Sequence, residues 1–183
     1  ATILVLGGSG LLGHHCSTQL KKDFNVVQTY NSNILDVPNS EFFSIEDLSR
    51  LKNILIRHKP KAIINTIALV TVDGCESNPS KAMELNSSFV SYLVETIQEM
   101  GLSGTHLLQI SSAGVYGSRE GGIQPWLETD DPKPISVYAG TKLEGESNAQ
   151  KYQGPSTILR TDFYGINPIS TKSLLWWIID HAN

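Results

Sequence analysis

The chain has 183 residues, 40% of them hydrophobic, and a formal net charge of −4, which suits about one domain with a buried core. Only 17% of the residues are charged, so a disordered chain extended by its own charge is excluded. No run of basic residues occurs, which argues against a nucleic-acid partner or an anionic membrane surface. The longest apolar run, Leu174 to Ile179, is far shorter than the roughly 20 residues that span a bilayer.

The cysteine content points to a reducing compartment. The chain holds 2 cysteines, Cys16 and Cys75, and their spacing suits neither a disulfide framework nor a metal site. We therefore expect a soluble cytoplasmic protein without a metal ion, and ordinary buried thiols at both positions.

Strands and helices alternate along the chain. Apolar runs rich in β-formers predict strands at 2–6, 25–30, 62–65, 106–111 and 156–160, and helical patterns cover 11–22, 44–58, 79–100, 136–152 and 173 onward. Ser44 and Asp47 resemble a capping box for the second of these helices. The alternation predicts an α/β, Rossmann-type, doubly wound parallel sheet with helices on both faces. The long irregular stretch at 113–135 is typical of a functional loop.

The first loop has the spacing of a phosphate-binding loop. Glycines at 7, 10 and 13, with Ser9, Leu11 and Leu12 between them, follow a strand and open a helix. Such glycines let the backbone approach a pyrophosphate at a helix N-terminus. The alternative is a glycine-rich turn without a ligand, but the strand–loop–helix context favours dinucleotide binding.

The end of the second strand bears on the choice of dinucleotide. An acidic side chain there would bind the ribose of NAD, but the sequence from Thr29 to Asn33 contains neither a carboxylate nor an arginine. Because no carboxylate repels a 2′-phosphate, NADP(H) is slightly favoured over NAD(H).

Tyr138 and Lys142 form a Y-x-x-x-K pair inside a predicted helix, where residues four apart share a face. A nearby ammonium would favour the phenolate and lower the pKa of Tyr138 toward a useful range. Such pairs are also common by chance. This one is supported by Ser111 and Ser112, which end the fourth strand at the edge where parallel sheets bind ligands; the alternation leaves open which serine faces the cleft.

These segments resemble the extended short-chain dehydrogenase/reductase family over the whole chain. The matching stretches are 7–13, 65–68, 111–117 and the pair Tyr138 and Lys142. Within the family, residues 72–76, 138–146 and 159–161 are most similar to the dTDP-4-dehydrorhamnose reductase group of nucleotide-sugar reductases.

The resemblance implies a role for each matched residue. It implies a catalytic Ser112, Tyr138 and Lys142; a pyrophosphate site at Gly7, Gly10, Leu11 and Leu12; Phe43 near the adenine; Ala68 and Leu69 along the cofactor; and Phe163 at the substrate. The implied reaction is NADP(H)-dependent reduction of a keto nucleotide sugar, with Tyr138 donating the proton and Lys142 binding the nicotinamide ribose.

Two positions depart from the reductase pattern. Ala113 follows Ser112 where these reductases carry Thr-Asp, and Tyr30 stands where they carry an acid. Two other functions therefore stay open: an NAD-dependent nucleotide-sugar epimerase, and a non-catalytic dinucleotide-binding subunit like the beta subunit of methionine adenosyltransferase. A sugar dehydratase is disfavoured, because Ala113 and Gly114 supply no carboxyl pair.

Among the remaining polar residues, we expect Asn65 and Asn86 to be structural. Glu144, Glu146, Asp130 and Asp131 are typical of a solvated face and loop.

The chain divides into a dinucleotide-binding domain at 1–165 and the start of a truncated substrate-binding lobe at 166–183. The resembling reductases continue for about a hundred residues to complete this lobe. The apolar run from Leu174 to Ile179 would cover every side of a helix at 3.6 residues per turn. We therefore expect self-association, as a homo-oligomer, through this helix.

Overall fold

A computed structural model describes residues 1–118, 125–169 and 174–182. Within them a parallel six-stranded sheet has the order β3-β2-β1-β4-β5-β6. The strands are β1 (Thr2–Leu6), β2 (Asn25–Tyr30), β3 (Ser40–Phe42), β4 (Ala62–Asn65), β5 (His106–Ser111) and β6 (Ser156–Arg160). The five predicted strands are confirmed, and β3 is an additional short edge strand. The Rossmann-type prediction is correct.

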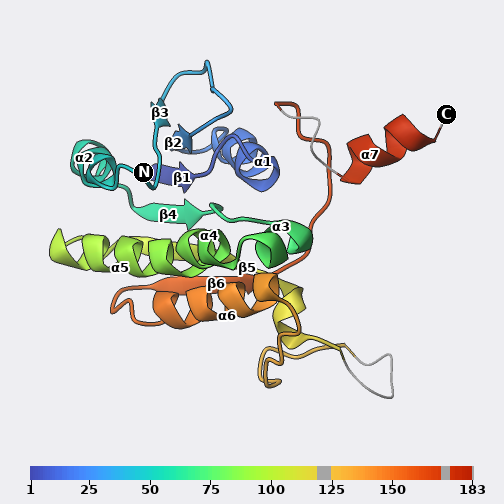
Figure 1. Cartoon of the computed structure of the whole chain (residues 1–183). Helices are drawn as coiled ribbons and strands as arrows, with labels where there is room; N and C mark the ends of the chain where they lie inside the picture. Colours follow the sequence, from blue (N-terminus) through green and yellow to red (C-terminus); the bar gives the residue numbers. More distant parts are fainter. Residues whose placement is uncertain (119–124, 170–173, 183) are drawn as a thin grey trace.

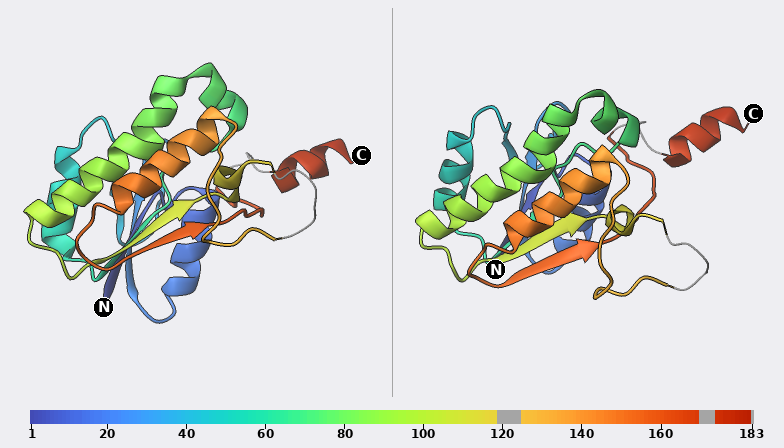
Figure 2. Two further views of the ribbon diagram at one scale, coloured as in Figure 1. Left: turned by 90° about the horizontal axis from the view of Figure 1, so that it is seen from below. Right: turned by 60° about the horizontal axis from the view of Figure 1, so that its bottom comes forward.

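Helices lie on both faces of this sheet (Figure 2). They are α1 (Leu11–Leu20), α2 (Ser49–His58), α3 (Val72–Ser77), α4 (Pro79–Met83), a π-helical turn (Glu84–Ser88), α5 (Phe89–Glu99), a 3₁₀ turn (Ala113–Tyr116), α6 (Val137–Ala149) and α7 (Leu174–His181). In Figure 2, α5 and α6 lie together on one face and α1 lies on the other.

Two apolar clusters hold the layers together. The larger joins α2, α5 and α6 to the sheet and includes Leu4, Leu51, Leu93 and Leu107, each fully buried. The smaller lies on the opposite face, where Val5 and Val26 pack with Leu20 of α1. Consecutive residues of β1, Leu4 and Val5, therefore point into different clusters, as expected for a strand covered on both faces.

The carboxyl ends of the strands form one edge of the sheet (Figure 1). The direction in which successive strands are added to the sheet changes between β1 and β4. Strands β2 and β3 lie on one side of β1, whereas β4, β5 and β6 lie on the other. Ligands of open α/β sheets bind outside the carboxyl ends at this switch point. We therefore expect a ligand site at the loops after β1, β4 and β5.

Helix α2 begins at Ser49, later than the capping-box prediction at Ser44, which is wrong. The Ser44 hydroxyl accepts a hydrogen bond from the Glu46 amide at 3.3 Å, and Asp47 accepts one from the Ser49 hydroxyl at 2.6 Å. Both candidate caps are thus used within a turn that precedes the helix, and no side chain caps its N-terminus.

The predicted helix at 79–100 is also interrupted. It starts at Pro79 as expected, with the Asn78 side chain accepting from the Lys81 amide at 3.0 Å. The π-helical turn at Glu84–Ser88 then separates α4 from α5, and it buries Asn86 and Ser87. Such turns are frequent at functional sites, and here the turn directs Asn86 toward the loop after β4.

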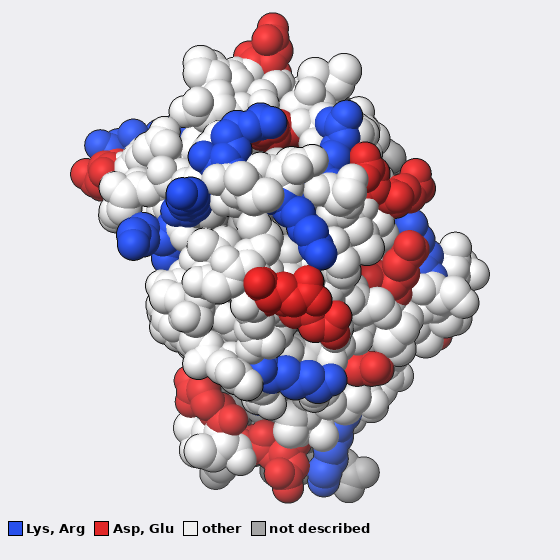
Figure 3. All heavy atoms as spheres, turned by 90° about the vertical axis from the view of Figure 1, so that its left-hand side faces the viewer, with Lys and Arg blue, Asp and Glu red and all other residues white. Residues whose placement is uncertain are grey.

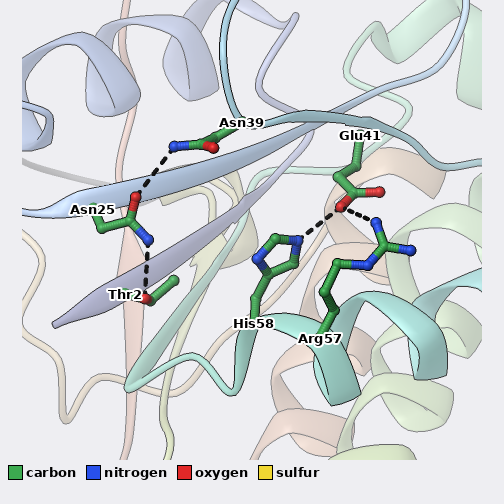
Figure 4. Close-up of polar contacts among 6 residues, drawn as sticks. All are labelled: Thr2, Asn25, Asn39, Glu41, Arg57 and His58. Carbon is green, nitrogen blue, oxygen red and sulfur yellow. Dashed lines mark hydrogen bonds and ion pairs between the residues drawn. The ribbon is translucent and has the colours of Figure 1, made fainter.

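Polar contacts fix the edge strand β3 (Figure 4). Its Glu41 carboxylate accepts from Arg57 Nη1 at 2.6 Å and contacts His58 Nε2 at 2.7 Å, both at the end of α2. At the amino ends of the strands, Asn25 links Thr2 to Asn39. Figure 3 shows that positive and negative side chains are interspersed on the face at this end of the molecule.

Helix α7 projects beyond the carboxyl edge (Figures 1 and 2). Trp177 is 59% exposed, and Ile178 and Ile179 are each 45% exposed. The expected start at Ser173 lies outside the described residues, as do the glycines at 121 and 122 of the predicted loop. Self-association through α7 and the division at residue 165 stay predictions. No helix within the described ranges is both long and apolar enough to cross a bilayer.

Candidate active site

The loop after β1 forms an open cradle at the start of α1. Gly7 has a φ of 85°, which favours glycine, and its carbonyl accepts from the Gly10 amide at 2.9 Å. A Cβ on Gly13 would overlap the Gly7 carbonyl oxygen, so the helix can approach the loop only with glycine there. Gly10 is the N-cap of α1, and no side chain caps this helix.

The space above Gly10 suits a pyrophosphate. A Cβ built on Gly10 would meet only the Gly7 oxygen, at 3.3 Å, so the side facing away from the protein is open. The first amides of a helix lack intrahelical acceptors and carry partial positive charge. The predicted residues Gly7, Ser9, Gly10, Leu11, Leu12 and Gly13 thus form a surface that can bind phosphate oxygens through the backbone.

The loop after β4 is held by buried asparagines. Asn86 accepts from the Leu69 amide at 2.8 Å and donates to the Leu69 carbonyl at 3.1 Å and to Thr141 Oγ1 at 3.0 Å. Asn65 donates to Gln109 Oε1 at 2.8 Å. Both asparagines are structural, as expected. Asn86 ties Leu69, and with it the neighbouring Ala68, to the helix that carries Tyr138.

Phe43 lies in the core rather than at the surface. Its side chain is 2% exposed, and its ring centroid is 5.7 Å from that of Phe89. Because the Phe43 side chain is buried, only the Phe43 backbone could contact an adenine.

The two serines at the end of β5 have different environments. Ser111 donates to the Glu146 carboxylate. Ser112 Oγ accepts from the Gly114 amide at 3.1 Å, and the Ser112 side chain is near enough to Tyr138 to lower the pKa of the phenol. Ser112 is therefore the serine beside the tyrosine, which settles the choice that the strand alternation left open.

Tyr138 is positioned by the N-terminus of α6. Ser136 caps this helix by accepting from the Ala139 amide at 3.2 Å, and this places Tyr138 in its first turn. Burial raises the pKa of Tyr138, the Ser112 hydrogen bond lowers it, and the charges of Asp162 and Cys75 raise it further. The net shift is upward, so the expectation of a lowered pKa is wrong for this structure.

The environment of Lys142 explains why the pKa of Tyr138 is not lowered. The Lys142 side chain is buried, and Nζ donates to the Ile110 carbonyl at 2.5 Å. Burial lowers the pKa of Lys142 to about 8, although the charge of Glu146 opposes the shift. The Lys142 ammonium is thus directed at the end of β5. The Lys142 side chain would have to turn for the ammonium to contact the Tyr138 phenol.

Glu146, one turn after Lys142, is not the solvated residue that the sequence suggests. It is 2% exposed and accepts from Arg160 Nε at 3.0 Å and Nη2 at 2.7 Å. Arg160 in turn lies over the Tyr116 ring, 4.7 Å from its centroid. The pair joins α6 to β6, and through Ser111, the neighbour of Ser112, to β5. The sequence gives no signal for it, because the partners are far apart in the chain.

The remaining predicted residue, Phe163, is 45% exposed in the segment after β6. A separate hollow of about 430 Å³ lies along β6, lined by Tyr116, Trp126 and Arg160 among others. Burial raises the pKa of both cysteine thiols, which makes them poor nucleophiles. Among the described residues, no group of three or more His, Cys, Asp or Glu could hold a metal ion.

Comparison with known proteins identifies the family of the chain. A family model described as "RmlD substrate binding domain" matches residues 1–168. The dTDP-4-dehydrorhamnose reductase of Salmonella typhimurium is 30% identical over 164 residues, which are 88% of this chain and 50% of the relative. The chain spans about half the length of the curated relatives that it matches.

Solved structures share the fold. A hypothetical dTDP-4-dehydrorhamnose reductase from Sulfolobus tokodaii superimposes with a TM-score of 0.74 at 31% identity, over 87% of this chain and 55% of that one. The UDP-glucose 4-epimerase of Brucella ovis, solved with NAD, gives 0.75 at 25% identity, over 87% and 51%. The chain therefore belongs to the RmlD substrate binding domain family, within the extended short-chain dehydrogenases/reductases.

Proposed function

We propose that this chain carries the cofactor site and the catalytic groups of an NADP(H)-dependent reductase that acts on a keto nucleotide sugar. The observation that carries the proposal is the convergence of the glycine cradle, Ser112 and Tyr138 at one edge of the sheet. The similarity to dTDP-4-dehydrorhamnose reductases supports the choice of substrate class.

The reaction divides between the cofactor and the protein. The reduced nicotinamide supplies the hydride. Ser112 donates a hydrogen bond to the carbonyl oxygen of the substrate, and Tyr138 transfers its phenolic proton to that oxygen. Because burial raises the pKa of Tyr138, this residue keeps its proton at neutral pH and is suited to act as the acid. Lys142 binds the nicotinamide ribose.

The preference for NADP(H) rests on the second strand. Tyr30 is followed by Asn31, Ser32 and Asn33, all exposed, and none of them would repel a 2′-phosphate. The amide and hydroxyl groups there can donate hydrogen bonds to phosphate oxygens. A cytoplasmic location, suggested by the cysteine content, is part of the same proposal.

An NAD-dependent nucleotide-sugar epimerase is the second candidate. It would use the same serine, tyrosine and lysine, and the structural similarity to a UDP-glucose 4-epimerase solved with NAD favours it. NAD that co-purifies in stoichiometric amount through gel filtration would support the epimerase, whereas exchangeable NADP(H) would support the reductase.

The first test is the variant Tyr138→Phe. It should bind NADP(H) like the wild type in calorimetry and lose about 10²–10⁴-fold in the rate of hydride transfer. A thermal-shift panel of NAD, NADP and nucleotide sugars on the wild type identifies the ligands. Near-normal turnover by the variant would remove Tyr138 from the mechanism, and cofactor binding without turnover in the wild type would favour the non-catalytic subunit.

A further inference from the structure

The segment after β6 brings a carboxylate to the catalytic pair. Asp162 Oδ1 lies 3.4 Å from Ser112 Oγ, and Ser112 is near enough to Tyr138 to affect the pKa of the phenol. We propose that Asp162 is a positioning residue that orients the Ser112 hydroxyl and holds Tyr138 in its protonated, proton-donating form. The proposal rests on the reductase function above, and it assigns to Asp162 the bias of the site toward reduction.

The hydrogen-bonding capacity of Ser112 sets the direction of these contacts. A hydroxyl offers one proton and two lone pairs, and an ionised carboxylate can only accept. Ser112 therefore donates to Asp162 and accepts from the Gly114 amide, at 3.1 Å. Its single proton cannot at the same time be donated to the Tyr138 oxygen, and that donation is what would lower the pKa of Tyr138. At 3.4 Å the contact with Asp162 is long for an O–H···O bond, so the Ser112 hydroxyl can turn to a substrate carbonyl at little cost.

The charge of Asp162 acts on Tyr138 in one direction. A nearby negative charge disfavours the phenolate and raises the pKa of the phenol. Reduction breaks the O–H bond of Tyr138 while the hydroxyl of the product forms, and the hydride brings the electron pair. A tyrosine that had already lost its proton could not complete this step, so the carboxylate favours the acid form that reduction requires.

The other titratable groups near Tyr138 do not replace Asp162. Cys75 from α3 would act in the same direction as an anion, but burial raises its pKa and keeps it neutral at neutral pH. Glu76 accepts from the Val137 amide at 2.8 Å. Lys142, on the same helix as Tyr138, donates to the Ile110 carbonyl. Asp162 is thus the carboxylate in hydrogen-bonding range of Ser112 within the described residues.

Asp162 comes from an element that the motif does not include. The residues directly after Ser112 are Ala113 and Gly114, which carry no carboxylate. Asp162 contacts the same serine from the segment after β6, two positions after the end of that strand. Because it is exposed, it can be replaced without leaving a cavity in the core.

The test is the variant Asp162→Asn, with Asp23→Asn as a control of equal charge change. Asp23 is exposed in the turn after α1, at the amino end of β2. The ionised fraction of Tyr138 is read from its ¹³Cζ signal, assigned with Tyr138→Phe, at the highest pH at which circular dichroism shows all variants folded. We expect a larger ionised fraction in Asp162→Asn than in the wild type or in Asp23→Asn.

Activity provides a second readout. The pH above which the reduction rate falls should move to lower pH in Asp162→Asn, with a loss in kcat above that pH and little change in KM. The NMR measurement needs no turnover, so it tests Asp162 even if the reductase function fails. Equal ionised fractions in Asp162→Asn and the wild type, or the same increase in Asp23→Asn, would overturn the proposal.

Discussion

The buried ion pair between Glu146 and Arg160 yields a quantitative prediction for stability. The Glu146 side chain is 3% exposed and that of Arg160 is 19% exposed. Glutamine at 146 keeps the volume but removes the charge, which leaves the guanidinium without a counter-ion. Removing one partner of a buried pair costs about 3–5 kcal/mol. Because Arg160 is partly exposed and glutamine still accepts one hydrogen bond, we expect a loss of about 2–3 kcal/mol for Glu146→Gln.

The assay is urea unfolding followed by circular dichroism, with Glu144→Gln as the control. Glu144 lies on the same helix, two residues away, and is exposed, so its neutralisation should change the free energy of unfolding by less than about 0.5 kcal/mol. A loss of 2–3 kcal/mol should lower Tm by roughly 4–12 °C for a chain of this size. Equal stability of the two variants would refute the reading of Glu146 as a buried, paired carboxylate.

Two further predictions concern single groups of the site. Lys142→Met should raise the free energy of unfolding at pH 7 by up to about 3 kcal/mol, because burial lowers the pKa of Lys142 from 10.5 to about 8. That advantage should shrink between about pH 8 and 10.5. In this range the wild type gains stability as the pH rises, because Lys142 binds its proton more tightly in the unfolded state than in the folded state. Urea titrations across the range check this prediction, and a Lys142→Met variant less stable than the wild type at pH 7 would contradict it. Gly10→Val should fold within about 1 kcal/mol of the wild type, since its Cβ meets only one atom, yet give no binding heat with NADP(H). Gly13→Val is the contrasting variant: its Cβ would overlap the Gly7 carbonyl, so we expect it not to fold. Unchanged cofactor affinity in Gly10→Val would refute the phosphate-loop interpretation.

The strands could be predicted because their signal is local. The run Thr2–Leu6 is apolar and buried from Ile3 onward and is followed by glycine, as is typical of a strand covered on both faces. Strand β3 carries no such signal: Ser40–Phe42 is short and half-buried, and its position depends on pairing with β2 and on the contacts of Glu41 with Arg57 and His58. Local patterns cannot report contacts of that kind.

The same limit applies to the capping residues. Ser136 and Ser44 both precede helical patterns, but only Ser136 caps a helix. Ser44 and Asp47 use their side chains within a turn instead. The motif alone does not decide between these outcomes, because a serine or aspartate can hydrogen-bond nearby amides in a turn as well as at a helix start.

The chemistry of α6 shows most clearly what sequence reasoning can and cannot supply. The spacing of Tyr138 and Lys142 makes them candidates, but the pKa of each depends on groups outside the motif. These are Ser112 and Asp162 for the phenol, and burial against the Ile110 carbonyl for the amine. A charged residue is usually exposed, and so the spacing alone placed Glu146 in solvent.

The contacts that position α6 are polar and join residues that are distant in the sequence. A Cβ on Gly145 would overlap the Asn86 carbonyl oxygen, so glycine is what allows α6 to pack against the π-helical turn. That close approach brings the Asn86 amide to Thr141, and on the same helix the Glu146 carboxylate binds Arg160 of β6. Each contact joins elements that no periodicity relates, and each fixes the rotation of the helix that presents Tyr138. The geometry of the proposed site therefore depends on these buried hydrogen bonds as much as on the Tyr138–Lys142 motif.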